Sequence, residues 1–131
     1  MSTVGTSAGR TAAVLTNGEV YGTVVDLSNA VDGKLAVDLS FTLNTLDSCT
    51  WRLAVGDTVT PTETLWINGL AMTGSLTGDT EAKMVFDCAG YRYARMALTG
   101  VGAVGASSAA FDYDYNDYTT VAQTNGALRN D

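Results

Sequence analysis

The acidic stretch at residues 112–117, with the sequence DYDYND, comes closest to a chemical site in this chain. Oxygen ligands at alternate positions are typical of the start of a calcium loop, which also needs glycine at its sixth position and a bidentate glutamate at its twelfth. Asp117 and Gln123 occupy those two positions. We therefore favour a strand with a buried aromatic face and a solvated acidic face. A different oxygen-rich cation site is the alternative.

Residue types that usually carry catalysis are scarce. The chain contains no histidine, which removes the usual base of nucleophilic triads and the commonest metal ligand. Its 14 acids could include a carboxylate pair for glycoside hydrolysis, but no spacing singles one out. Cys49 and Cys88 cannot supply the four ligands of a zinc site. The sequence thus predicts no enzyme activity, no catalytic residue, no metal and no cofactor.

The segment around residues 91–95 carries side chains suited to protein contacts. Tyr91, Tyr93 and Arg95 fall on one face of a predicted strand. Tyrosine and arginine are enriched at binding hot spots. The interpretation we favour is a ladder in which this face pairs with Asp112 and Asp114 on a neighbouring strand. An exposed binding face is the alternative.

The segment Gly100–Ala106 holds three glycines and no side chain larger than valine. Phosphate-binding loops are also rich in glycine, but they precede a helix and usually contain a lysine. Neither feature is present here. A flexible hairpin tip is the predicted structure.

Trp66 is the aromatic residue with the most open interpretation. In a strand it falls on the opposite face from Leu65 and Ile67. A lone tryptophan on a strand usually packs in a core or between subunits, and we predict that here. A platform for stacking a sugar ring is the alternative.

These residues are positioned by segments in which apolar and polar side chains alternate, which is the pattern of a half-buried strand. In the clearest, Lys34–Leu43, the inward positions are Leu35, Val37, Leu39, Phe41 and Leu43. Other predicted strands are Thr11–Thr16, Glu19–Leu27, Thr50–Val55, Glu63–Met72, Glu81–Cys88 and those that start near Tyr91 and Ser107. About eight strands with turns between them favour an all-β fold, an antiparallel β-sandwich of jelly-roll type.

Two Asn-Gly pairs mark turns between these strands. Asn17-Gly18 lies between apolar segments and predicts a tight hairpin, because both central residues of a type I′ turn need positive φ. Asn68-Gly69 predicts a bend or bulge.

Length and charge limit the classes of function. The 131 residues form one domain, with a flexible or extended arm predicted at 1–10, the sandwich at 11–118 and a tail at 119–131. A net charge of −7 with scattered basic residues argues against nucleic-acid binding. No apolar run is long enough to cross a membrane, and the first ten residues are unlike a signal peptide. We expect synthesis in a host cytosol and reduced, buried cysteines, with one disulfide as the alternative.

The C-terminal third resembles small strand-rich virion proteins of tailed bacteriophages. The resemblance lies in the strand Tyr91-Arg92-Tyr93-Ala94-Arg95, the small-residue loop Gly100–Ala106 and the closing segment Ala110-Phe111-Asp112-Tyr113. It implies a capsid decoration, or cement, protein that binds the exterior of the virion and bridges neighbouring major capsid proteins, frequently as a homotrimer.

Under this interpretation the protein contacts its own copies and the major capsid protein, and it binds no nucleic acid and no membrane. The alternatives are a carbohydrate- or receptor-binding module of a phage tail or fibre, and a subunit of a neck or tail connector. The candidate partner-binding residues are Arg10, Trp66, Tyr91, Tyr93, Arg95, Val101, Val104, Leu128 and Arg129.

Overall fold

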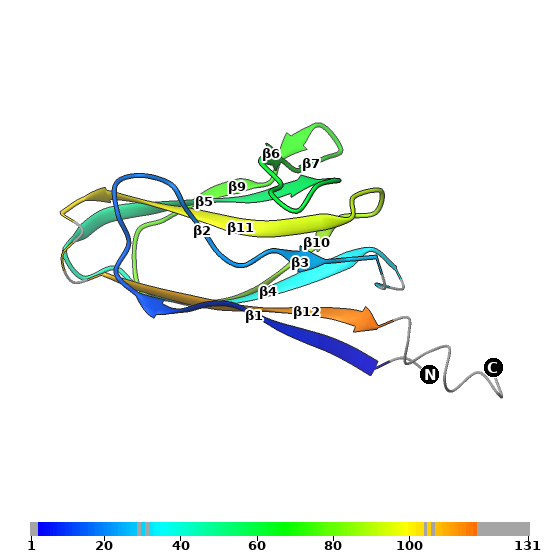
Figure 1. Ribbon diagram of the computed structural model, residues 1–131. Coiled ribbons are helices and arrows are strands. Elements are labelled where there is room, and N and C mark those ends of the chain that lie inside the picture. Colours follow the sequence, from blue (N-terminus) through cyan, green and yellow to red (C-terminus); the bar gives the residue numbers. More distant parts are fainter. Residues whose placement is uncertain (1–2, 29, 31, 104, 106, 118–131) are drawn as a thin grey trace, which may run out of the picture.

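The computed structural model describes residues 3–117 except 29, 31, 104 and 106, and every regular element in this part of the chain is a β-strand (Figure 1). Two antiparallel sheets pack face to face, so the predicted all-β antiparallel sandwich is confirmed. The described residues form twelve strands, more than predicted, because five of the twelve are only two residues long.

The strands are β1 (Thr3–Ala13), β2 (Val20–Tyr21), β3 (Val25–Asp26), β4 (Lys34–Thr42), β5 (Leu46–Gly56), β6 (Glu63–Thr64), β7 (Trp66–Ile67), β8 (Leu70–Ala71), β9 (Thr73–Leu76), β10 (Thr80–Asp87), β11 (Tyr93–Gly102) and β12 (Ser108–Asp117). One sheet has the order β1-β12-β4-β10. In the other, β11 and β5 pair along their length, β2 and β3 flank β11, and β6 and β9 flank β5. A separate hairpin consists of β7 and β8.

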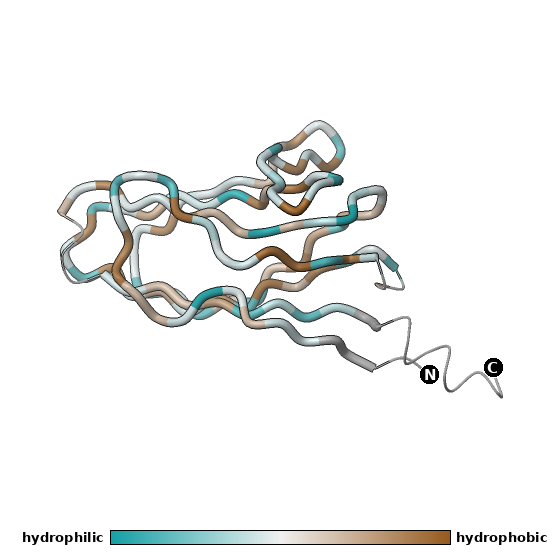
Figure 2. The backbone as a smooth tube through the Cα atoms, viewed as in Figure 1, coloured by the Kyte–Doolittle hydropathy of each residue, from teal (hydrophilic) through white to brown (hydrophobic). Residues whose placement is uncertain are grey.

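Alternating side chains build the core between the two sheets. The prediction for β4 is confirmed, since Leu35, Val37, Leu39 and Phe41 are all buried, while Leu43, just after the strand, is partly buried. Hydrophobic residues recur along the strands of both layers (Figure 2). The Trp51 and Phe86 rings meet edge to face across this core, with centroids 5.8 Å apart. Period-two patterning therefore identified the inward faces of the strands.

The predicted ladder between the Tyr91 and Ser107 strands is wrong. β11 pairs with β2, β3 and β5, whereas β12 pairs with β1 and β4 in the opposite sheet. Asp114 instead forms an ion pair with Lys83 of β10, with 3.1 Å between Oδ2 and Nζ. Gly100 to Gly102, the start of the predicted hairpin tip, belong to β11, and the connection that follows leads to β12 in the opposite sheet, so no hairpin is formed. Local sequence does not distinguish these two connections, because both need only a short, sterically permissive loop.

The two Asn-Gly pairs exchange the roles that the sequence predicts. Asn17 and Gly18 are not in the left-handed region, and the strands on either side, β1 and β2, belong to different sheets. The Asn17 side chain instead donates to the carbonyls of Gly100 and Gly102. Asn68 and Gly69 have φ of 52° and 80°, and they form the tight turn of the β7–β8 hairpin.

The N-terminal segment forms part of the sandwich. Residues 3–10, where the sequence predicts a flexible or extended arm, lie in β1, which pairs with β12 from Thr3 to Ala13. Thr23 secures this edge to the other sheet, since its amide donates to the Gly9 carbonyl and its hydroxyl to that of Ala8. The tail predicted at 119–131 lies outside the described residues.

The two cysteines are free and buried. Burial raises the pKa of the Cys49 thiol to about 11 and that of the Cys88 thiol to about 12. Because the thiolate is the reactive form, we expect Ellman's reagent at pH 8 to label the native protein at least ~100-fold more slowly than the urea-unfolded chain. A control in urea should titrate two thiols. Rapid native labelling, or fewer than two thiols in urea, would contradict the described geometry.

Candidate partner-binding surface

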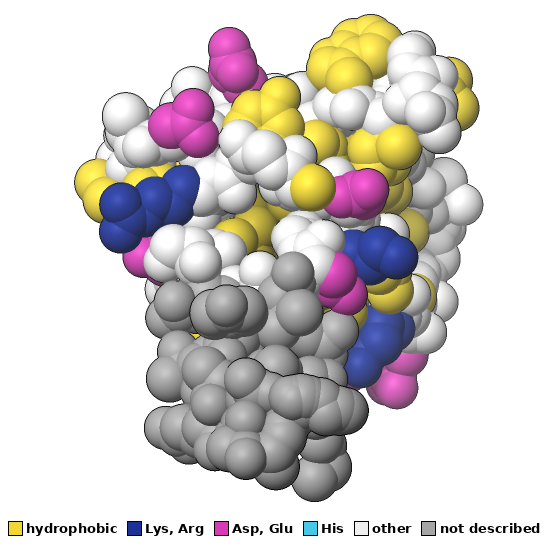
Figure 3. Space-filling model, turned by 90° about the vertical axis from the view of Figure 1, so that its right-hand side faces the viewer, with side chains coloured by type: hydrophobic (Ala, Val, Ile, Leu, Met, Phe, Trp, Pro, Cys, Tyr) yellow, Lys and Arg dark blue, Asp and Glu magenta, His cyan; other side chains and the backbone are white. Residues whose placement is uncertain are grey.

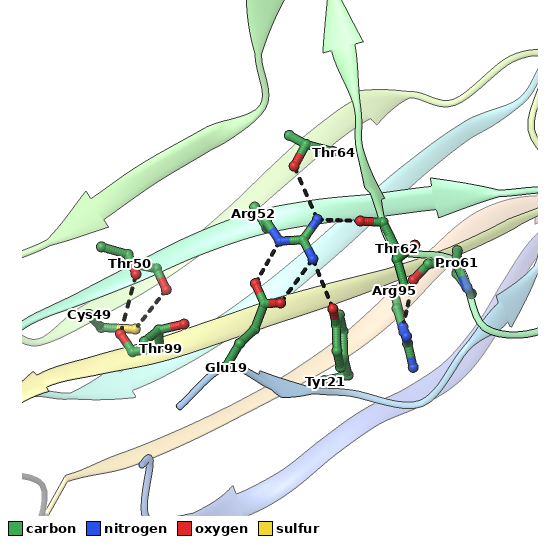
Figure 4. Close-up of polar contacts among 10 residues, drawn as sticks. All are labelled: Glu19, Tyr21, Cys49, Thr50, Arg52, Pro61, Thr62, Thr64, Arg95 and Thr99. Atoms are coloured by element: carbon green, nitrogen blue, oxygen red, sulfur yellow. Dashed lines mark hydrogen bonds and ion pairs between the residues drawn. The ribbon is translucent and has the colours of Figure 1, made fainter. Parts of the chain in front are cut away.

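Arg52 organises the outer face of the six-stranded sheet (Figure 4). Its Nε and Nη2 donate to the two carboxylate oxygens of Glu19, at 2.6 and 2.9 Å. Nη2 also donates to the Tyr21 hydroxyl, and Nη1 donates to the Thr62 carbonyl and the Thr64 hydroxyl. A guanidinium has five N–H donors, and all five are occupied here.

This saturation gives Arg52 a structural role. Its hydrogen bonds lower the pKa of Glu19, and the same pairing raises the pKa of Arg52. The group joins residues from β2, β5 and β6 into one network. With no donor left over, Arg52 positions its neighbours and does not itself offer hydrogen bonds to a partner.

Arg95 lies beside this network but keeps donors available. Its Nε donates to the Pro61 carbonyl at 2.9 Å, and its guanidinium carbon lies 3.6 Å from the centroid of the Tyr21 ring. Neither terminal nitrogen makes a hydrogen bond to the described residues. Stacking on Tyr21 and the Nε hydrogen bond hold the guanidinium plane, so the two terminal nitrogens, which form a planar fork of donors, are oriented before any partner binds. Such a fork suits a carboxylate or a backbone carbonyl of another protein.

A second exposed arginine extends this surface towards the start of β11. Arg92 pairs with Asp26 at 3.3 Å, and its guanidinium lies over the Tyr93 ring at 5.0 Å. The pKa of Asp26 is lowered, first by the Ser28 amide and then by Arg92. Because both ionic groups are about half exposed, water screens this pair strongly.

The β7–β8 hairpin is the most apolar exposed feature near this face. Trp66 and Leu70 are 63% and 68% exposed. Figure 3 shows hydrophobic side chains gathered at the top of the molecule, where this hairpin lies. The loop that leads to it is held at Pro61 by Arg95 and at Thr62 by Arg52. The two arginines therefore help to position the segment from which the hairpin projects.

The structure separates the predicted site residues into groups. Tyr93 and Arg95 lie on the outer face described above, with Tyr91 just before it, 37% exposed. Trp66 does not pack in the core of the chain, because the hairpin carries its side chain into solvent, and its packing between subunits stays a prediction. Val101 is exposed towards the other end of β11.

Arg10 belongs to β1 of the opposite sheet. Its Nε donates to the Ala109 carbonyl of β12. The remaining candidates, Val104, Leu128 and Arg129, lie outside the described residues.

Within the residues that the structure describes, no three His, Cys, Asp or Glu side chains gather in a way that could hold a metal ion. No helix there is long and apolar enough to span a membrane.

Comparisons with known proteins identify the fold. No protein family matches this chain, and no curated protein matches its sequence. It is similar to the solved structure of the SPBc2 prophage-derived protein YomS, with a TM-score of 0.60 and 12% identity over 89% of this chain and 96% of that one. A chain of infectious bursal disease virus, Gx strain, matches with a TM-score of 0.50 and 10% identity over 89% of this chain. This chain spans about a third, 32%, of the viral chain.

Sequence reasoning missed the residues that support Arg95. Tyr21 and Pro61 come from two separate segments and meet only because β2 and β5 flank β11. The sequence did carry a signal for an outward Arg52, since it alternates with Trp51 and Leu53. The sequence did not indicate that Glu19 is the hydrogen-bond partner of Arg52, because strand order decides which side chains become neighbours.

Proposed function

We propose that this chain is a structural protein of a virion, a decoration or cement protein that binds the capsid exterior and contacts the major capsid protein. The observation that supports this most is the sandwich fold it has in common with the prophage-derived YomS over nearly the whole length of both chains. The partial similarity to a chain of infectious bursal disease virus supports the same class of protein. The proposed mode of action is adhesion, without catalysis.

The surface chemistry is compatible with this role. An exposed tryptophan and a preorganised arginine are the residue types that most often dominate binding energy at an interface. Many copies on one shell would act together, so each contact can be modest. The net charge of −7 favours solubility before assembly. The resemblance adds a homotrimer to this proposal, and that state stays a prediction.

Co-sedimentation with purified phage heads, taken from a phage that encodes this chain, tests the proposal. We expect Trp66→Ala and Arg95→Ala each to weaken binding by at least ~10-fold, because each removes an anchor from the partner-binding surface. Val14→Ala, a change at an exposed position on a different part of the fold, should bind as the unaltered protein does. Circular dichroism confirms that each variant is folded. Heads that bind all three variants equally, or that do not bind the unaltered protein, would overturn the proposal.

A second candidate is a carbohydrate- or receptor-binding module of a phage tail or fibre. The exposure of Trp66 favours it, because a solvent-facing indole can stack on a sugar ring. A glycan array separates the two candidates. Glycan binding that Trp66→Ala abolishes would support this second function, and an array without binding would remove it.

A further inference from the structure

The outer edge of β10 is open. β10 is the last strand of its sheet, and it pairs on one side only, with β4, in an unbroken register from Thr80 to Asp87. No segment in the described part of the chain pairs with its other side. Because strand amides and carbonyls point alternately to either side, this edge presents unpaired backbone donors and acceptors to solvent.

The other strands that border a sheet carry features that discourage pairing. β1 has register shifts between Ala8 and Arg10 and between Arg10 and Ala13, so its edge is irregular. In the other sheet β2, β3 and β6 are two residues long and β9 is four. Short strands, bulges and charged side chains are the usual protection against edge-to-edge contacts. β10, with eight regular residues, lacks the first two features, and the charges on its solvent face alternate in sign.

The solvent face of β10 contains an apolar residue between two charges. Val85 is 64% exposed, with Lys83 two residues before it and Asp87 two residues after it. An exposed valine flanked by opposite charges on an open edge is self-complementary. A second, antiparallel β10 would place Val85 against Val85 and each Lys83 against an Asp87.

Other registers of such a pair are less favourable. Only registers that keep side chains on matching faces conserve the pleat. Pairing Lys83 with its own copy opposes like charges, and pairing it with Val85 opposes Glu81 and Asp87. Pairing Lys83 with Glu81 is compatible in charge, but it leaves Val85 beyond the centre of the contact. With Val85 on the twofold axis, each Lys83 faces an Asp87 and the two valine side chains bury each other.

We propose that two copies of this chain associate through β10, edge to edge and antiparallel, with Val85 on the twofold axis. The two four-stranded sheets then form one continuous sheet across the dimer. Backbone hydrogen bonds supply the contact. The Lys83 ammonium lies 3.1 Å from Asp114 of its own chain and in the dimer also faces Asp87 of the other copy, and these charges fix the register. Such an interface is isologous and closes after two copies. This dimer takes the place of the homotrimer that the resemblance implies. It does not depend on capsid binding, so either proposal can fail without the other.

The first test uses two valines with the same exposure. Val85 and Val59 are each 64% exposed, but Val59 lies in the loop after β5 and not on β10. Analytical ultracentrifugation across a concentration series should give the unaltered protein and Val59→Lys twice the mass of one chain. Val85→Lys brings two cations together on the axis, and we expect its dimer dissociation constant to rise at least ~10-fold.

The second test examines the register. A cysteine at position 85 would face its own copy at the Cα separation of a directly opposed pair, about 4.5 to 5.5 Å, which a disulfide can bridge. We expect Val85→Cys to form a covalent dimer under mild oxidation. Lys83→Cys should not, because Lys83 faces Asp87 of the other copy. The native cysteines are buried and contribute no background.

Each outcome decides the proposal. A dimer that Val85→Lys disrupts and Val85→Cys traps supports it. A monomer at all concentrations, a trimer, or equal behaviour of the two lysine variants would overturn it. Cross-linking through Lys83→Cys in place of Val85→Cys would overturn the register.

Discussion

Gly22→Ala is expected to lower the free energy of unfolding by about 3 kcal/mol, because it forces a methyl group into a space that Phe111 fills. A Cβ at Gly22 would lie 2.3 Å from Cζ of Phe111 and 2.9 Å from the Gly9 carbonyl oxygen. The Phe111 ring is buried and also borders Gly9, whose Cβ would lie 2.3 Å from it. Neither the ring nor the backbone can move without disturbing the junction between the two sheets.

Urea denaturation measures this effect, with Gly18→Ala as the matched control. A Cβ at Gly18 meets nothing closer than 3.8 Å, so we expect that variant to stay within about 0.5 kcal/mol of the unaltered protein. Phe111→Leu replaces the ring with a smaller side chain that leaves room for the new methyl group. The Gly22→Ala, Phe111→Leu double variant should therefore lose less unfolding free energy than the two single variants added together. Equal midpoints for Gly22→Ala and Gly18→Ala would show that Phe111 does not occupy the described position.

The same junction shows how far the sequence could predict the structure. Alternation along Lys34–Thr42 identified the buried residues of β4, because side-chain period follows directly from strand geometry. The same alternation in β12 correctly predicted that Phe111 and Tyr113 are buried. Strand order was out of reach, since β11 and β12 are adjacent in sequence yet lie in opposite sheets.

The candidate surface was accessible from the sequence only in part. Tyr93 and Arg95 were recognisable from residue type and shared parity, and the structure places both on the outer face of β11. Trp66 was predicted to pack in a core or between subunits, because a strand normally buries one face. The core is excluded, since Trp66 sits on a two-stranded hairpin that projects from the sandwich. The contacts of Arg52 with Glu19 and Thr62 depend on long-range pairing, which short-range patterns do not encode.

Tyr113→Phe is expected to lower the free energy of unfolding by about 2 kcal/mol, because a buried amide and a partly buried carbonyl then lose their partner. The Tyr113 hydroxyl donates to the Thr23 carbonyl at 2.8 Å and accepts from the Met96 amide at 3.1 Å. It thereby joins β12 of one sheet to β11 and the β2–β3 connection of the other. Tyr21→Phe is the control, since its hydroxyl bonds to Arg52 on the outer face, where water can replace it.

The effect of alkaline pH distinguishes this role of Tyr113 from simple packing. Burial raises the pKa of Tyr113 to about 12 in the folded protein, whereas an unfolded tyrosine titrates near ~10. The unfolded chain therefore loses this proton first, and the stability that Tyr113 contributes is complete below pH ~10 and is lost as pH rises from ~10 to ~12. We expect urea denaturation over this range to show a shallower decline for Tyr113→Phe than for the unaltered protein and Tyr21→Phe. Parallel declines in all three would mean that the Tyr113 hydroxyl reaches solvent, and the bridge between the sheets would then be absent.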